Sequence, residues 1–358
     1  MKLSIGILAH NESDLIAASL QSLGQQSLFT SLDEKHSVEI IVVANGCSDN
    51  TADLARNTLK QIGFIHQTSL SWRVCEVKEA GKSNAWNLFV HQFSAPDADF
   101  FCLMDADIKL HNYQTLAKMI EVLVENPEYW IALDRPIKDI ELKENKSWID
   151  KLSVAVSQSS NAGQLYICGQ LYCGRAEVLR NIWMPAGLPV EDGFLTQMII
   201  SENFTVKNPT FTKRIVRVTE ASHIFEAYTN PLELINHEVR VVVGIVVNIF
   251  LTYYLQEKLC AAGSFRGSPE LTAGTLINQM NRENPLWLND FVRNSLVQKK
   301  WWLIPIPLVF RRYRSLKHHS LQKALLRIPI ATLAFIVDLS IFIRANITLH
   351  RKVISNYW

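Results

Sequence analysis

The six cysteines of this 358-residue chain are spaced neither like metal ligands nor like a disulfide framework. Cys168 and Cys173 lie five residues apart, and the other cysteines are scattered along the chain. This spacing argues against a structural zinc site and against a small disulfide-stabilised fold. We therefore expect free, buried thiols in a reducing cytoplasm.

The chain also has no excess of one charge. Its formal net charge is +2 and 48% of its residues are hydrophobic, which is typical of a globular protein. A nucleic-acid-binding or disordered chain would be more strongly charged. The apolar start, Met1–Ala9, is short and runs directly into Asn11 and Glu12, which does not fit a secretory signal. We expect a cytoplasmic protein without a nucleic-acid partner.

Uninterrupted apolar runs of membrane-spanning length are missing as well. Val241–Gln256 contains no charged residue and Ile328–Ile343 contains only Asp338. Each run is shorter than the roughly twenty residues of a spanning helix, so neither is a clean transmembrane segment.

Strand and helix patterns do alternate through the first hundred residues. Apolar runs that end in polar residues predict strands, and apolar residues at helical spacing predict helices between them. The predicted strands are Leu3–Ala9, Val38–Ala44, Arg73–Lys78 and Phe100–Met104, and the predicted helices are Ser13–Gln25, Ala52–Ile62 and Lys82–Phe93. Repeated β-α units with short links predict an α/β fold with a mostly parallel central sheet flanked by helices.

Two acids, Asp105 and Asp107, follow the fourth predicted strand. Ligands of open α/β sheets bind at the carboxyl ends of the strands. Two carboxylates in this position require a counter-charge, and a divalent cation with oxygen ligands supplies one. The alternative is a turn that carries two acids by chance, because aspartate is common where a chain leaves a strand.

Four motifs in order resemble those of family 2 glycosyltransferases. They are Ile7-Leu-Ala-His-Asn-Glu12, Val42-Val-Ala-Asn-Gly-Cys-Ser-Asp-Asn-Thr51, Ala80-Gly-Lys-Ser-Asn-Ala-Trp-Asn87 and Met104-Asp-Ala-Asp107. The resemblance covers about the first two thirds of the chain. It implies the A-type glycosyltransferase fold, whose Rossmann-like domain binds a nucleotide-sugar.

The resemblance also implies which residues face the donor. Nucleotide-sugar contacts would come from the two strand ends, the third motif and the first acid: Ala9, His10, Asn11, Glu12, Asn45, Gly81, Lys82 and Asp105. The family usually has an acid at the position of Asn45 and often a tyrosine at that of His10. These differences leave the identity of the donor's nucleotide base undecided. There are two alternatives: Asn45-Gly46 is only a turn, and Lys82 is only a solvated residue at a helix start.

A bound Mg²⁺ or Mn²⁺ is a further implication of the resemblance. Asp107 would hold the cation, which would grip the diphosphate and act as a Lewis acid for the leaving group. His223 is the candidate for a further ligand, because several family members place a histidine late in the domain. A structural histidine in the core is the alternative at that position.

The acceptor side is expected between Ile167 and Thr196. There the family places a glycine-bearing strand and a Glu-Asp pair at the head of a helix, so Gly169 would border the sugar and Asp192, next to Glu191, would be the general base. A carboxylate can take the proton of an acceptor hydroxyl while that oxygen attacks the anomeric carbon, and one such displacement inverts the centre. Helix capping by Glu191 or Asp192 is the competing role.

The last third is expected to be a helical, membrane-associated extension. Asn236-His-Glu-Val-Arg-Val241 stands where cellulose and hyaluronan synthases carry Gln-x-x-Arg-Trp; Arg240 can still face the diphosphate, but the mismatch disfavours a processive synthase. Apolar residues from Trp301 to Phe310 precede a basic cluster of Arg311, Arg312, Arg314, Lys317, Lys323 and Arg327. This pattern suits an anionic membrane surface. A buried helix pair, or a homodimer contact, is the alternative.

These expectations describe an inverting, metal-dependent glycosyltransferase on the cytoplasmic face of a membrane. Its donor would be a nucleotide-sugar, most readily a UDP-sugar, and its acceptor a hydroxyl of a saccharide or glycolipid. Residues 1–230 would form the catalytic domain, with a nucleotide-sugar-binding half at 1–110 and an acceptor-side half at 111–230, and 231–358 the helical region. A sugar-phosphate nucleotidyltransferase would need an early glycine-rich loop, and Leu8–Leu15 has no glycine. A non-catalytic nucleotide-sugar sensor is the other alternative.

Overall fold

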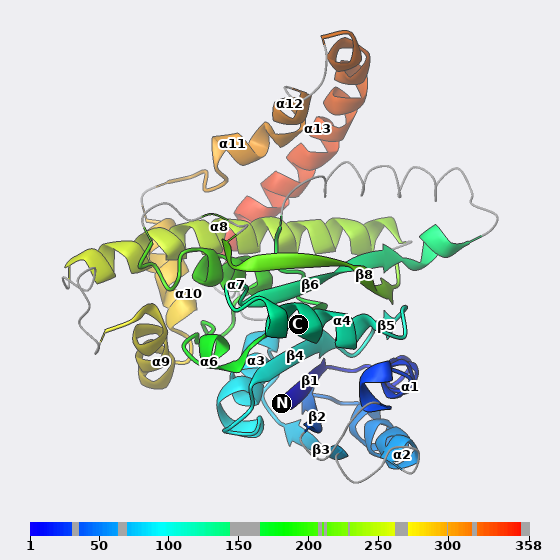
Figure 1. Ribbon diagram of the computed structural model, residues 1–358. Coiled ribbons are helices and arrows are strands. Elements are labelled where there is room, and N and C mark those ends of the chain that lie inside the picture. The colour runs from blue at the N-terminus through cyan, green and yellow to red at the C-terminus, as the bar shows by residue number, and fades with distance from the viewer. Residues whose placement is uncertain are drawn as a thin grey trace.

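The computed structural model describes residues 1–30, 36–63, 70–143, 165–206, 210, 213–227, 230–261, 271–298, 300–316 and 321–351. These residues form a mixed sheet with helices on both faces, as the sequence predicts (Figure 1). The strands are β1 (Lys2–Ala9), β2 (Ser37–Asn45), β3 (Leu70–Val77), β4 (Phe100–Asp105), β5 (Lys109–Leu110), β6 (Ile131–Lys138), β7 (Leu171–Arg175) and β8 (Ile215–Phe225).

The helices occupy links between strands and most of the described residues of the last third. In the first two thirds they are α1 (Ile16–Gly24), α2 (Thr51–Gly63), α3 (Lys82–Leu88), α4 (Thr115–Glu125), α6 (Ala176–Leu179) and α7 (Glu191–Ile200). In the last third they are α8 (Pro231–Ala261), α9 (Ala273–Glu283), α10 (Trp287–Phe291), α11 (Ile306–Val309), α12 (Arg311–Ser315) and α13 (Leu321–His350).

The strand order is β3-β2-β1-β4-β7-β6-β8-β5. The predicted parallel part is present, because β3, β2, β1 and β4 run parallel to one another. Strand β7 is antiparallel to both of its neighbours, β4 and β6. The carboxyl ends of β1, β2 and β4 therefore meet at one edge of the sheet, where ligands of such sheets bind.

Alternating side chains of the central strands fill a core on each face. On β1, Leu3, Ile5 and Ile7 pack against α1, α2 and α4, whereas Leu8 faces α3 and α7. The core on the Leu8 face of the sheet, here called the second core, continues into the long helix α8. This helix adds Val243 and Val247, both fully buried. Because both faces are covered, the central strands β1, β2 and β4 are buried along almost their whole length, whereas the edge strand β3 alternates between more and less exposed residues.

The two apolar runs of the last third lie within longer helices. Helix α8 spans 31 residues and α13 spans 30. By length and composition Leu232–Leu259 and Ala324–His350 could each cross a membrane, so the expectation that they are too short is wrong. Much of α8 nevertheless closes the core of the body, which was the alternative for this segment.

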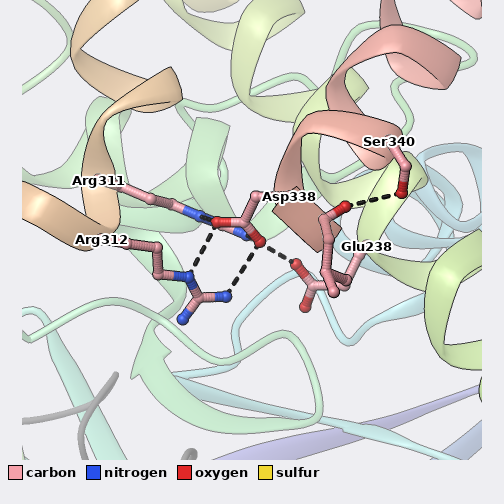
Figure 2. Close-up of polar contacts among 6 residues, drawn as sticks. Glu238, Arg311, Arg312, Asp338 and Ser340 are labelled. Atoms are coloured by element: carbon pink, nitrogen blue, oxygen red, sulfur yellow. Dashed lines mark hydrogen bonds and ion pairs between the residues drawn. The ribbon is translucent and has the colours of Figure 1, made fainter. Parts of the chain in front are cut away.

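The predicted basic cluster is partly neutralised. Arg311 and Arg312 both bind the carboxylate of Asp338 on α13, and Arg311 also reaches Glu238 on α8 (Figure 2). These two arginines therefore join helices to one another and are not simply a lipid-binding patch. Lys317 and the side chain of Lys323 lie outside the described residues.

Helix α8 also sets the position of α7. Gly244 lies so close to Val190, which precedes α7, that a β-carbon on Gly244 would come within 2.5 Å of the Val190 Cβ. Four residues later, Asn248 Nδ2 donates a hydrogen bond of 3.0 Å to the Val190 carbonyl. The start of α7 is thus fixed by one close approach and one hydrogen bond.

We expect Gly244→Ala to destabilise the protein. The added methyl group would overpack the α7–α8 contact at a cost of about 1 to 3 kcal/mol, more than the gain in helix propensity. Urea unfolding measures the change, and Tyr253→Ala, on the exposed side of α8, is the control expected to have a small effect. A Gly244→Ala variant as stable as the parent would contradict this packing.

Candidate active site

The predicted donor-side residues gather at one edge of the sheet. Ala9, Asn45 and Asp105 are the last residues of β1, β2 and β4, so the motifs that follow them converge. The α7 start, with Glu191 and Asp192 in its first turn, faces the same edge, because Lys82 bridges to it. The site is therefore built by three parallel strands and one helix.

Lys82 lies at the centre of the site. Its Nζ is 2.7 Å from the carboxylate of Asp105 and 3.0 Å from Glu191 Oε1. The lysine begins α3, and Gly81 before it has a φ of +139°, a conformation that favours glycine. The side chain of Lys82 is only 22% exposed, so the alternative of a solvated surface lysine is not what the structure contains.

One lysine cannot fully neutralise two acids. Burial alone would lower the pKa of Lys82, but the carboxylates of Asp105 and Glu191 raise it well above its ordinary value. Burial would raise the pKa of Glu191, yet the Lys82 charge keeps it below its ordinary value. Burial raises the pKa of Asp105 to about 7, against the opposing charge of Lys82. Lys82 is thus the shared counter-charge of two buried acids, and one positive charge is too little for both.

The loops after β1 and β2 are fastened to each other. Asn11, at a φ of +55°, accepts a 2.8 Å hydrogen bond from the backbone of Ser48. The Glu12 N–H donates to the Thr51 hydroxyl at 2.8 Å, and His10 Nδ1 lies 2.8 Å from the Asn45 carbonyl oxygen. These contacts hold His10, Asn11 and Glu12 beside the second motif, as the sequence predicts for residues of one site.

Asn45 has an oxygen available for a ligand. The side chain is fully buried, and its Nδ2 donates to the Glu79 carbonyl oxygen at 2.6 Å. Its Oδ1 is buried without a hydrogen-bond partner among the described residues. A buried acceptor without a donor is costly, so this oxygen suits the N–H group of a bound base.

Acidic groups accumulate around Asp107. One oxygen of its carboxylate, Oδ1, is buried and has no hydrogen-bond partner in the described part of the chain. Burial, followed by the charges of Asp107 and Asp105, raises the pKa of Glu12 to about 7. An orphaned carboxylate oxygen within a group of oxygen donors fits a hard divalent cation. Within the described residues no three acidic, histidine or cysteine side chains are already arranged as a metal site.

His223 lies on β8, next to the strand that follows Asp107. Residue Leu110 of β5 is paired with it in the sheet. Its ring is fully buried, with Nδ1 2.7 Å from Asp134 Oδ2 and Nε2 3.2 Å from Gln170 Oε1. A carboxylate on one nitrogen is the usual support of a metal-binding histidine, and it leaves Nε2 as the only nitrogen that could bind a cation. Ligation would require Gln170 to move aside, so this role of His223 stays a prediction.

The acceptor-side residues surround the Glu-Asp pair. Gly169 lies two residues before β7, and a β-carbon on it would come within 2.8 Å of Glu191 Oε1 and 3.6 Å of Asp192 Cβ. Burial and the Glu191 charge raise the pKa of Asp192 to about 6, and the positive charge of Arg240 on α8 opposes this rise. Gly169 and Asp192 therefore lie side by side, and Arg240 is near enough for its charge to act on Asp192.

A family model supports this assignment of the motifs. The model described as glycosyl transferase family 2 matches residues 4–182, which is half of the chain. The protein belongs to glycosyl transferase family 2. A search of curated protein sequences finds no match.

One of two similar solved glycosyltransferase structures shares the fold of this family 2 member. Mannosyltransferase PcManGT from Pyrobaculum calidifontis, solved with GDP-Man and Mn²⁺, is 16% identical, has a TM-score of 0.51, and the match covers 97% of this chain and 85% of that one. Glucosyl-3-phosphoglycerate synthase from Mycobacterium tuberculosis, solved with Mg²⁺ and UDP, is 16% identical with a TM-score of 0.45 over 68% of this chain and 77% of the other. At this identity the first likeness concerns the fold alone.

Sequence reasoning missed two residues of this family 2 site. Asp134, 2% exposed on β6, binds His223, and the backbone carbonyl of Gln170 accepts a 2.8 Å hydrogen bond from the Asp105 N–H. The acid within the apolar stretch Ile131-Ala-Leu-Asp134 was a usable signal, because a buried acid needs a partner. No sequence signal singled out Gln170.

We expect Lys82→Met to destabilise the family 2 domain by about 1 to 3 kcal/mol, because it leaves Asp105 and Glu191 buried without their shared cation. The loss should be smaller than for a fully buried ion pair, because all three side chains are partly exposed. Urea unfolding measures the change. Lys118→Met, which breaks an exposed pair with Glu121, is the matched control with an expected loss below about 0.5 kcal/mol. Equal losses in the two variants would contradict the central role of Lys82.

Proposed function

We propose that the protein is an inverting, metal-dependent glycosyltransferase that moves a sugar from a nucleotide-sugar to a hydroxyl of a saccharide or glycolipid. The arrangement that carries this proposal is Lys82 held between Asp105, on the donor side, and Glu191, beside the candidate base Asp192. A single lysine therefore contacts both the donor side and the acceptor side of the site. Membership of glycosyl transferase family 2 supports the reaction class.

Asp192 is the general base of this proposal. Its carboxylate takes the proton of the acceptor hydroxyl while that oxygen forms a bond to the anomeric carbon. The bond between the anomeric carbon and the phosphate oxygen breaks on the opposite side, and the nucleoside diphosphate leaves with the electron pair. One displacement of this kind inverts the anomeric centre.

Positive charge at the donor diphosphate favours its departure. Asp107, whose Oδ1 is buried without a hydrogen-bond partner among the residues that the structure describes, and His223, through Nε2, would hold Mg²⁺ or Mn²⁺. The bound cation would supply Lewis acidity for the leaving group. Arg240 on α8, whose charge acts on Glu191 and Asp192, would add a second positive group that faces the diphosphate. Asp105, which shares Lys82 with Glu191, would lie near the ribose or the donor sugar.

The base pocket of this proposal is centred on Asn45. Its buried Oδ1 accepts a hydrogen bond from a ring N–H, and uracil N3–H is such a donor. His10, Asn11 and Glu12 lie next to it on the loop that is fastened to the second motif. We expect a UDP-sugar as the donor, and because guanine also has a ring N–H, GDP-sugars are the necessary comparison in any assay.

We expect Asp192→Asn to lower sugar transfer by at least about 10²-fold while leaving UDP affinity nearly unchanged, since the amide cannot take a proton. The measurement uses Mn²⁺ with a panel of radiolabelled nucleotide-sugars, follows release of the free nucleoside diphosphate, and determines UDP binding calorimetrically. Asp53→Asn, on the exposed side of α2, is the control.

Two results of that assay would overturn the proposal. Loss of UDP binding in Asp192→Asn would mean that this residue holds the donor and is not the base. Release of pyrophosphate from UTP and a sugar phosphate, without sugar transfer, would identify a nucleotidyltransferase instead.

The rate of transfer should depend on the ionisation of Asp192. Its pKa is raised to about 6, and only the ionised form can act as a base. We expect kcat/KM at saturating Mn²⁺ to fall as the pH drops below about 6 and to level off above it. A profile that stays flat through pH 6, or rises on acidification, would rule out a base with this pKa.

A further inference from the structure

Helices α11, α12 and α13 form an arm that projects from the body of the molecule (Figure 1). The outer side of α13 carries a large set of exposed apolar side chains, here called the outer face: Leu325, Leu326, Ile328, Ile330, Leu333, Ile336, Val337, Leu339, Ile343 and Ile347. Leu326 is 78% exposed and Leu333 is 67% exposed. Scattered exposed apolar residues are ordinary on a soluble protein, but a continuous set of this size marks an interaction surface.

The width of the outer face indicates what kind of partner covers it. At about 100° per residue the outer face spans roughly 200° of the helix circumference, and at 1.5 Å per residue it runs for about 33 Å. An apolar stripe that packs against one neighbouring element can be as narrow as about 100°. Lipid acyl chains can cover such a wide convex surface, whereas one partner helix leaves much of it exposed.

Charged residues at the middle of the arm oppose a spanning orientation. Asp338 lies on the inner side of α13, is 2% exposed, and accepts hydrogen bonds of 2.9 to 3.1 Å from Arg311 and Arg312 of α12 (Figure 2). Arg311 continues to Glu238 on α8 at 3.3 Å. If Ala324–His350 crossed a bilayer, this cluster would lie near the centre of the hydrocarbon, where charged groups are costly.

The charge of the arm is complementary to an anionic surface. Asp338 is the only acid in α11, α12 and α13, and two arginines bind it. Arg314 and Arg344 add exposed positive charge, and neither forms an ion pair with an acid in the described part of the chain. Basic side chains beside an apolar helix face are typical of helices that lie in the headgroup layer.

We propose that the outer face of α13 lies in the plane of an anionic membrane leaflet, with its apolar side chains in the acyl-chain boundary and the Arg311–Arg312–Asp338 cluster turned away from the hydrocarbon. The protein is then attached to one leaflet without crossing it. The ion cluster fixes which side of α13 faces the lipid, because it fastens the inner side to α12 and α8. This attachment does not depend on the transferase chemistry proposed above.

Flotation of the full chain with vesicles tests the proposal. We expect binding to vesicles of phosphatidylcholine and phosphatidylserine, weaker binding to phosphatidylcholine alone, and release by alkaline carbonate. The double variant Leu333→Glu, Ile336→Glu should lower the bound-to-free ratio about tenfold or more. The reason is that two apolar side chains that would be buried in the membrane are replaced by charged ones. Val124→Glu, at an exposed apolar position on α4, is the matched control and should bind as the parent does.

Three outcomes would overturn the proposal. Equal vesicle binding by the double variant and the parent would exclude the outer face as the contact. Resistance to carbonate extraction would indicate a spanning helix. A parent that does not bind vesicles but is dimeric by light scattering, with a monomeric double variant, would assign the outer face to a second copy of this chain. The release of nucleoside diphosphate by the double variant, measured in solution, separates these results from a failure of the catalytic proposal.

Discussion

An excess of negative charge around one lysine is the constraint on which this active site depends. Glu12, Asp105, Asp107, Glu191 and Asp192 converge where Lys82 and Arg240 supply the positive charge. Burial makes the deficit costly, and it appears as raised pKa values at Glu12, Asp105 and Asp192. A cation with a diphosphate donor would complete the site. The folded protein thus contains unbalanced negative charge that a bound cation would neutralise.

Helix α8 connects this site to the rest of the chain. It closes the second core, holds the start of α7 through Gly244 and Asn248, and brings Arg240 towards the Glu-Asp pair. Its Glu238 joins the ion cluster that fastens α13. The proposed catalytic machinery and the proposed membrane contact therefore share one structural element, and a leaflet bound to α13 would lie in a fixed relation to the acceptor side of the site.

The strands and the donor-side motifs were predictable because each apolar run ends in its own polar motif, and parallel order then brings those ends together. The start of α1 was predicted three residues before Ile16, because the residues from Glu12 to Leu15 form a turn whose Glu12 carbonyl already accepts a hydrogen bond from the Ile16 N–H. The partners of His223 were not predictable, because Asp134 and Gln170 lie 89 and 53 residues away in sequence. Pairing of Arg311 and Arg312 with Asp338 likewise depends on tertiary contact.

We infer that the acidic group at the strand ends binds a divalent cation together with the donor. Mn²⁺ titration in the presence of UDP, followed by electron paramagnetic resonance, tests it most directly. We predict one tightly bound Mn²⁺ per chain, with affinity lowered at least about tenfold in Asp107→Asn and in His223→Ala. Equal Mn²⁺ affinity in the parent and in Asp107→Asn would contradict the account.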